Sequence, residues 1–471
     1  MKVRAIVLTL IIALLASFGV FAQEENGTIA DVVTAYATGD APEFTSLLAA
    51  IEAADPSVLE TLSNPDAQLT VFAPTDAAFA ELPSFVTDYL MANTDVLTQV
   101  LTYHVVDGAY LSADVLGMID ELGNAVIPTL NGAELTLSAD LDTLTVKLDQ
   151  ATIVLEMIDI AASNGVIHVI DSVLVPPVEL TYEPPAFVEG SVAMAGSSTV
   201  GPLTEVIMFN YREEAGGDAA AIELTNDITG TGGGFDRFCG EGVTDLSNAS
   251  RAIKDDEVAE CQAIGREPIE FRVGTDALSV VVNPAADWIE DVTVEELAQL
   301  LGTATTWADV REGWPNEPII RYTPGTESGT FDFFNEVVFE EDETIPLAAS
   351  NLTTNNDDNV LLLGVAENQY AIGYFGYAYY VNNSDSLKLL RVNGIEANAE
   401  TVEASGDAAY PLARPLFIYG AASIFAEKPV VGEFVRYYLA TVNDVIGEVG
   451  YFPANPFRLN IAKLEIIALT N

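Results

Sequence analysis

Apolar residues change their spacing several times in the first third of the chain. Over residues 31–54 they recur every three or four positions, which predicts helices with one buried face. Residues 69–73 and 166–170 are short apolar runs that predict buried strands. Apolar and polar positions alternate over residues 135–148, as they do in paired strands. This part of the chain is therefore expected to mix helices with strands.

Strands and helices alternate more regularly in the remainder of the chain. Residues 191–195 predict a strand, and Pro202 suits the first turn of a helix that follows it. Residues 278–282 are continuously apolar, which is typical of a strand buried on both faces of a sheet. Residues 292–301 predict a helix with acidic residues in its first turn. Such alternation favours an open α/β sheet that binds ligands at the ends of its strands.

A proline-rich segment separates the two patterns. Pro184-Pro185 and Gly190 are typical of a linker, which we place at residues 178–190. We therefore expect one domain over residues 27–177 and a second over residues 191–471.

The first 22 residues have the features of a signal peptide. Lys2 and Arg4 precede an apolar run over residues 5–16, and Ala22 suits the cleavage position. No cysteine stands at the cleavage junction, which argues against a lipid anchor, and no other stretch is apolar over the length of a membrane span. We expect an exported protein, periplasmic or extracellular at the cell surface, with no membrane span after cleavage.

The charge of the chain excludes several partners. There are 71 acidic and 18 basic residues, and the formal net charge is −53. Nucleic acids and anionic membrane surfaces both require a basic face, so neither is an expected partner. Disorder is also disfavoured, because 49% of the residues are hydrophobic and can form a large core.

Common enzyme motifs are absent from the sequence. There is no Gly-x-Ser-x-Gly elbow and no Gly-x4-Gly-Lys-Ser/Thr loop. Residues 178–471 contain no histidine that could act as the base for a nucleophile. The two histidines, His104 and His168, stand in apolar segments that we interpret as strands, and we expect them to be structural rather than metal ligands. We therefore expect neither an enzyme nor a bound metal or cofactor.

The chain has two cysteines, Cys239 and Cys261. In an oxidising compartment an even pair favours a disulfide. A two-cysteine metal site is the alternative, and it is weak because both histidines lie far upstream.

Three predicted loop-to-helix junctions are rich in neutral hydrogen-bond donors. They are residues 196–202, 229–235 and 324–330, and each places hydroxyls and backbone amides at the start of a helix. Such positions favour an anion, because the helix dipole and the first N–H groups point toward it. Ser250 and Arg251 add a hydroxyl and a fork-shaped cation. Taken singly, each is more often a helix cap, a turn or an ion pair. Together in one α/β domain they favour an anion site.

The same residues carry a resemblance to a known family. The stretches AGSSTVGPLTE, GTGGGFDRFCGEGVTDLSNASRAIKDDE, GTDALSVVVNP, YTPGTESGTFDFF, DDNVLLLGV and AIGYFGYAYY resemble PstS-like phosphate-binding proteins of bacterial ABC transporters. The resemblance covers about residues 191–471. It implies a type 2 periplasmic binding protein fold with two lobes, each discontinuous in sequence. It also implies capture of inorganic phosphate between the lobes for uptake, with a transporter permease as partner.

The resemblance also implies individual site residues. The phosphate-binding positions fall on Ser198, Thr199, Val200, Thr231, Ser250, Ser328, Gly329 and Thr330. Cys239 and Cys261 match a disulfide found in one branch of the family.

Two positions depart from the pattern of the best-known members. Arg251 stands where those members have an aspartate that accepts the phosphate proton, and Pro324 stands where they have an arginine. We infer that Arg251 now supplies the cation. The proton acceptor is left unassigned, and Glu327 is a candidate.

The first domain resembles a different family. The stretches LTVFAPTDAAFAEL, LTYHVVDGAYLSADV and NGVIHVIDSVLVPP resemble a fasciclin domain over residues 27–177. This implies a compact α/β wedge used in extracellular adhesion. Two functions follow: a phosphate receptor tethered by its fasciclin domain, or an adhesive or structural protein whose lobes hold another oxyanion or no ligand.

Overall fold

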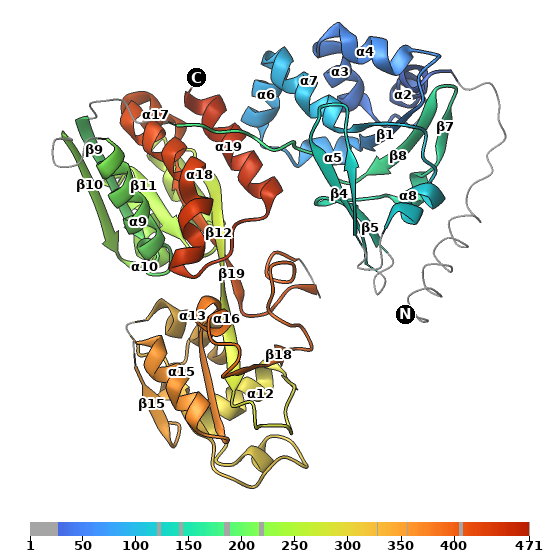
Figure 1. Cartoon of the computed structure of the whole chain (residues 1–471). Coiled ribbons are helices and arrows are strands. Elements are labelled where there is room, and N and C mark those ends of the chain that lie inside the picture. The colour runs from blue at the N-terminus through green and yellow to red at the C-terminus, as the bar shows by residue number, and fades with distance from the viewer. Residues whose placement is uncertain are drawn as a thin grey trace. The chain divides into compact units, whose positions relative to one another are not determined.

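The computed structural model describes residues 27–119, 124–140, 145–182, 189–215, 221–326, 328–355, 357–404 and 408–470. The expected signal peptide lies outside these residues, as do residues 183–188 of the expected linker and Glu327. The chain packs as two compact units that divide between Glu179 and Leu180. Figure 1 traces both units from blue to red along the chain.

Helices make up much of the first unit. They are α2 (Ile29–Thr38), α3 (Thr45–Ala53), α4 (Pro56–Ser63), α5 (Asp76–Ala80), α6 (Ser84–Ala92), α7 (Thr94–Tyr103) and α8 (Ser112–Met118). The helical pattern predicted over residues 31–54 is confirmed as two helices, α2 and α3. Gly39 and Pro42 lie between them and account for the break, because neither residue favours a helix interior.

The strands of the first unit form two four-stranded sheets. One has the order β2 (Val105–Asp107), β1 (Leu69–Pro74), β8 (Gly165–Ile170), β7 (Ile160–Ala162), with β1 and β8 parallel. The other is antiparallel, in the order β3 (Asn124–Pro128), β4 (Glu134–Asp140), β5 (Thr145–Leu148), β6 (Ala151–Thr152). The strands predicted at residues 69–73 and 166–170 are therefore confirmed, and those predicted over residues 135–148 are confirmed as β4 and β5, apart from residues 141–144, which lie outside the described residues.

The two histidines are held by backbone groups. His104 follows α7 as its C-cap, so its predicted place in a strand is wrong, because β2 begins one residue later. Its Nδ1 lies 2.8 Å from the Val100 carbonyl oxygen, and its Nε2 accepts from the Leu174 N–H at 2.9 Å. His168 lies in β8 as predicted, and its Nε2 is 2.9 Å from the Tyr110 carbonyl oxygen. These contacts support the structural interpretation of both residues.

The second unit is built on one nine-stranded sheet. The order is β10 (Ala221–Ile228), β9 (Glu189–Gly196), β11 (Leu246–Ala249), β19 (Ala413–Gly420), β12 (Ile269–Val282), β16 (Ala371–Gly376), β14 (Ile320–Thr323), β15 (Leu352–Thr354), with β17 (Lys388–Leu389) also paired to β12. A short pair, β13 (Asp291–Val292) and β18 (Arg391–Val392), lies apart from it.

Two long strands divide this sheet into two lobes. β12 pairs with β19 from Ile269 to Ala277, and then with β16 from Leu278 to Val282. We call the part with β9, β10 and β11 lobe A, and the part with β14, β15 and β16 lobe B. Figure 1 shows β12 and β19 running from the green strands into the orange lobe. Val280, Val281 and Val282 are fully buried, which confirms the strand predicted at residues 278–282.

Helices cover both lobes. Lobe A carries α9 (Val200–Glu214), α10 (Gly230–Phe235), α11 (Asp255–Ala263), α17 (Ala422–Glu427), α18 (Pro429–Val449) and α19 (Pro456–Thr470). Lobe B carries α12 (Val294–Ala298), α13 (Gly329–Phe339), α14 (Thr344–Leu347), α15 (Asp358–Glu367) and α16 (Tyr377–Val381). The helix predicted over residues 292–301 begins later, at Val294. Val292 instead pairs in β13, and the Thr293 hydroxyl caps the helix by accepting from the Glu296 N–H.

Candidate functional site

The three predicted junctions all lie between a strand and a helix. β9 ends at Gly196 before α9, β10 ends at Ile228 before α10, and β14 ends at Thr323 before α13. β9 and β10 are parallel, so the first two junctions lie at the same edge of the lobe A sheet. The third junction belongs to lobe B.

The first and third junctions meet. A Cβ placed on Gly329 would lie 2.6 Å from the Ser198 Oγ and 3.0 Å from the Thr199 Oγ1. A larger residue at this position would displace the Ser198 hydroxyl and crowd the Thr199 hydroxyl, both of which belong to the other lobe. Glycine therefore suits the close approach here rather than a turn.

A buried arginine stands at this meeting point. Arg414 of β19 is paired across the ladder with Asp276 of β12, and its Nε donates to the Asp276 carboxylate at 3.0 Å. Its Nη2 donates to the Thr199 hydroxyl and, at 2.8 Å, to the Gly329 carbonyl oxygen. The guanidinium also lies over the Phe333 ring, 4.3 Å from its centroid. One cation thus contacts both lobes at the place where their hydroxyl-rich junctions come together.

The ion pair has little access to water. Arg414 is 7% exposed and Asp276 is 2% exposed. Burial raises the pKa of Asp276, and the charge and hydrogen bond of Arg414 oppose that rise. The two charges nearly cancel, so the pair holds the Arg414 guanidinium in place without adding a net positive charge to the site.

The second junction contributes a pair of hydroxyls. The Thr231 Oγ1 lies 3.2 Å from the Ser250 Oγ and accepts from the Ser250 N–H at 3.2 Å. Sequence segments 19 residues apart are thereby joined, and both hydroxyls lie beside the α10 amino terminus.

Helix capping accounts for part of the predicted pattern. Ser197, which was not among the predicted site residues, accepts from the N–H groups of Thr199 at 3.1 Å and Val200 at 3.4 Å. Ser328 caps α13 by accepting from the Thr330 N–H at 3.2 Å. These hydroxyls hold the first turns of α9 and α13 in place.

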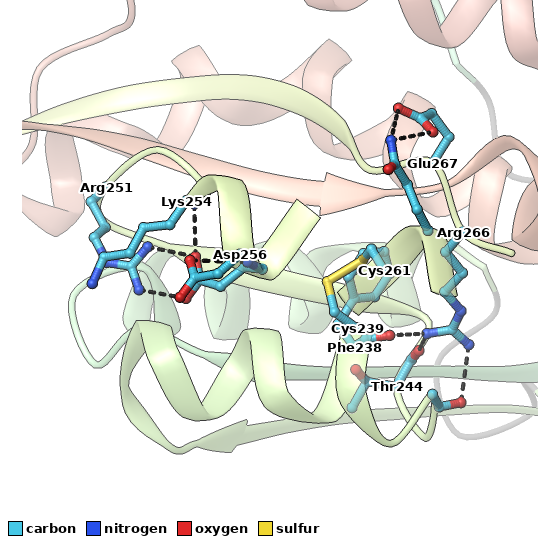
Figure 2. Close-up of a disulfide and its surroundings, with 12 residues drawn as sticks. Phe238, Cys239, Thr244, Arg251, Lys254, Asp256, Cys261, Arg266 and Glu267 are labelled. Carbon is cyan, nitrogen blue, oxygen red and sulfur yellow. Dashed lines mark hydrogen bonds and ion pairs between the residues drawn. A yellow bond between two sulfur atoms is a disulfide. The ribbon is translucent and has the colours of Figure 1, made fainter. Parts of the chain in front are cut away.

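Arg251 makes a different contact from the one we inferred. Its guanidinium binds both oxygens of Glu257, at 2.7 and 2.8 Å, and lies 5.5 Å from the Phe235 ring centroid. Figure 2 shows Arg251 with these bonds drawn as dashed lines. The Glu257 hydrogen bond raises the pKa of Arg251. The cation that contacts the first and third junctions is Arg414, and an anion-binding role for Arg251 stays a prediction.

Sequence reasoning assigned no role to Arg414 or Asp276. A signal was available, because each is the one charged residue of a mostly apolar run, in LARPLFIY and TDALSVVV. Charged residues inside buried strands are rare unless they are paired, so the two runs together indicate a buried ion pair.

The expected disulfide is present. Cys239 and Cys261 are bonded and both are fully buried. The bond links the turn after α10 to α11, and it overturns the two-cysteine metal site. Nearby, Arg266 donates to the carbonyl oxygens of Phe238 at 2.6 Å and Thr244 at 2.9 Å, as Figure 2 shows. These links fix the segment between Thr231 and Ser250.

The His, Cys, Asp and Glu side chains of the described residues form no group of three or more that could hold a metal ion. Within the same part of the chain, the helices include none both long and apolar enough to cross a membrane.

The fold and the site together define a two-lobed solute-binding protein preceded by a separate α/β domain. The chain belongs to the PBP superfamily, whose domain model matches residues 181–440. A fasciclin domain model matches residues 42–176. Both resemblances and the predicted fold class are thereby confirmed.

Individual relatives cover the second unit. Protein SphX of Synechocystis is 38% identical over 60% of this chain and 83% of its own length. The phosphate-binding protein PstS of Staphylococcus saprophyticus is 33% identical over 59% of this chain and 86% of its own. Among solved structures, a possible phosphate-binding protein from Planctomyces limnophilus is 34% identical, with a TM-score of 0.55, over 60% of this chain and 100% of its own.

Proposed function

We propose that the second unit is a receptor that captures inorganic phosphate between its two lobes for uptake. The observation that carries this proposal is the buried Arg414, which bonds Thr199 of lobe A and Gly329 of lobe B. The relatives named as phosphate-binding proteins support phosphate as the ligand. Capture of this kind involves no covalent chemistry, so the receptor acts as a binding protein rather than an enzyme.

The binding groups belong to the two lobes. Lobe A offers Ser198, Thr199, Val200, Thr231 and Ser250, with Arg251 at its edge, and lobe B offers Ser328, Gly329 and Thr330. Hydroxyls and backbone amides at helix amino termini bind oxyanions without a large net charge. Hydrogen bonds to a charged partner contribute about 1.5–3 kcal/mol each, so several of them suffice for tight binding.

The carboxylates beside Arg414 favour an anion that carries a proton. Burial raises the pKa of both Asp276 and Asp332, and the charge of Arg414 opposes the rise in each case. A carboxylate next to an oxyanion is tolerated when a proton lies between them. Phosphate keeps a proton near neutral pH and sulfate does not, so in their ionised form these side chains favour phosphate.

The first unit is proposed to tether the receptor. The match to a fasciclin domain over residues 42–176 supports a role in adhesion to a wall, matrix or protein partner. The apolar run after Lys2 and Arg4 supports export, and hence a place in the periplasm or at the cell surface. A transporter permease is the proposed recipient of the phosphate.

Calorimetric titration of the purified mature chain tests the receptor function. We expect heat from phosphate and arsenate near neutral pH and much weaker heat from sulfate. Arg414→Lys, which keeps the charge and loses the fork, is expected to weaken binding at least tenfold. The same titration of Arg251→Lys shows whether that side chain contributes. If phosphate gives no heat, the receptor function is wrong. The alternative is then an adhesive or structural protein whose lobes hold another oxyanion or no ligand.

A further inference from the structure

The chain makes a short excursion from lobe A to lobe B near its carboxyl end. α18 of lobe A ends at Val449, and Gly450 follows with a φ of 100°, a conformation that suits glycine. The N–H groups of Gly450 and Tyr451 bond to the Ile446 carbonyl oxygen at 3.2 and 3.1 Å. A Cβ on Gly450 would lie 3.1 Å from the Ala378 Cβ of lobe B. We call Gly450–Phe452 the strap, and after it the chain returns to lobe A as α19.

Phe452 fixes the strap to the strand that joins the lobes. Its N–H and carbonyl oxygen bond to the backbone of Thr275, at 2.8 and 2.9 Å, as an isolated antiparallel bridge. Thr275 directly precedes Asp276, the partner of Arg414. The Phe452 ring lies 4.8 Å from the Tyr377 ring and packs on the lobe B core. The strap is therefore held on the lobe B side of the meeting point.

Tyr451 reaches back to the first junction. Its hydroxyl donates to the Thr199 carbonyl oxygen at 2.9 Å. Burial raises the pKa of Tyr451, as does the nearby Asp276 carboxylate, while Arg414 opposes the rise. The phenol therefore stays protonated and keeps its role as a donor.

The geometry of the peptide bond makes this contact relevant to the site. The Thr199 carbonyl and the Val200 N–H belong to one planar peptide group and point in opposite directions. A hydrogen bond that fixes the carbonyl therefore also fixes the direction of the Val200 N–H. That amide opens α9, makes a long hydrogen bond of 3.4 Å to the Ser197 hydroxyl, and is one of the groups that we assign to the ligand.

We propose that the strap positions the Val200 amide for the ligand and couples it to lobe B, with Tyr451 as the positioning residue. This inference rests on the proposed function of the same site. Tyr451 acts on the Val200 amide through the Thr199 carbonyl group, and Phe452 links the position of Tyr451 to that of lobe B.

Tyr451→Phe in the full mature chain tests the proposal, because it removes the hydroxyl and keeps the ring. The matched control is Tyr410→Phe. Tyr410 is also buried and also donates to a backbone carbonyl oxygen, that of Leu278 at 2.8 Å, but it lies outside the first junction. Thermal melting of both variants establishes that each is folded.

The first measurement uses no ligand. Hydrogen exchange of the amides in residues 199–201 is expected to be several times faster in Tyr451→Phe than in the wild type, and unchanged in Tyr410→Phe. The second measurement is calorimetry with inorganic phosphate. We expect a loss of about fivefold to tenfold in affinity for Tyr451→Phe, the effect of one hydrogen bond, and less than twofold for the control.

The two measurements separate this inference from the function on which it rests. If the wild type binds no phosphate, the receptor function fails, and the exchange of the Val200 amide still decides whether the strap positions it. Equal exchange and equal affinity in Tyr451→Phe and Tyr410→Phe would overturn the proposal.

Discussion

Removal of Arg414 should show how much the buried ion pair contributes to the second unit. Arg414→Met keeps much of the apolar stem that lies on Phe333, but it leaves the Asp276 carboxyl without the guanidinium 3.0 Å away. Both partners are less than 10% exposed, at 7% and 2%. Breaking a buried pair by removing one partner costs about 3–5 kcal/mol, so we expect the free energy of unfolding to fall by about that amount at pH 7.

The pH dependence of this loss identifies its cause. Without Arg414, burial is opposed only by the hydrogen bond from the Ala277 backbone, and the pKa of Asp276 rises further above its value in the unfolded chain. A carboxyl with a raised folded pKa stabilises the protein below its unfolded pKa, and that stability is lost as the pH rises through the folded pKa. The deficit of Arg414→Met should therefore shrink between pH 7.5 and pH 5. Adding Asp276→Asn should recover most of the stability without recovering phosphate binding.

Urea unfolding followed by tryptophan fluorescence measures the stability of the second unit. The three tryptophans, Trp288, Trp307 and Trp314, all belong to the lobe B core, so the signal reports the second unit. Arg251→Met is the control. Its pair with Glu257 is partly exposed, at 29% and 15% of the side chains, and we expect a cost of about 1 kcal/mol or less. A deficit for Arg414→Met that matches this control, or that stays constant from pH 7.5 to pH 5, would refute the reasoning.

Three further predictions concern buried groups elsewhere. Glu465 is 5% exposed, and burial, followed by the charge of Glu270, raises its pKa well above the usual value. The stability that the protonated Glu465 carboxyl contributes is lost as the pH rises through that raised pKa. Glu465→Gln should therefore raise the melting temperature at pH 8, by about 2–4 °C for each kcal/mol of stability gained, and change it little at pH 5. Equal shifts at both pH values would contradict this. Replacement of Cys239 and Cys261 by serine should lower the unfolding free energy of the second unit by about 3 kcal/mol, and a reductant should have the same effect on the wild type and none on the variant. Burial lowers the pKa of His104 to about 4, so the unfolded chain binds a proton that the folded chain does not once the pH is below about 6.5. The first unit should therefore lose stability as the pH falls from 6.5 to 4, measured by circular dichroism. The free energy of unfolding should fall more steeply in the wild type than in His104→Gln, by up to about 1.4 kcal/mol per pH unit. Parallel slopes would show that the histidine is not the cause.

Features set by nearby residues could be predicted from the sequence. The first and third junctions follow from a strand, a few small or hydroxylated residues and an apolar helix, all within about a dozen positions. Ser328 before Gly329 is such a case, because a serine that caps a helix acts on an amide two residues away. The disulfide was also predictable, since the chain offers one possible pair.

The role of Arg414 could not be read in the same way. Its partner Asp276 lies 138 residues earlier, and the two meet only because β12 and β19 pair in a register that puts them opposite each other. That register depends on the whole sheet and not on the residues beside either side chain. The ion pair of Arg251 is of the opposite kind, because its partner is only six residues away. Glu257 lies at the third position of α11, where it also accepts from the Lys254 N–H at 2.8 Å, and a capping glutamate is a natural partner for an arginine just before the helix.

A chain with a net charge of −53 can hold a small anion only if the attraction is local. Arg414 does not supply a net positive charge, because Asp276 pairs with it. The favourable field must therefore come from oriented amides, and the two longest helices that begin at the junctions, α9 and α13, have 15 and 11 residues. Their amino termini meet where Gly329 approaches Ser198, so their dipoles act on the same small volume. Distant carboxylates are screened beyond about 10 Å at moderate salt, whereas amides at a helix terminus act at contact distance. The ion pair and the strap then serve one purpose, which is to keep those amides aligned in a protein whose remaining charge opposes the ligand.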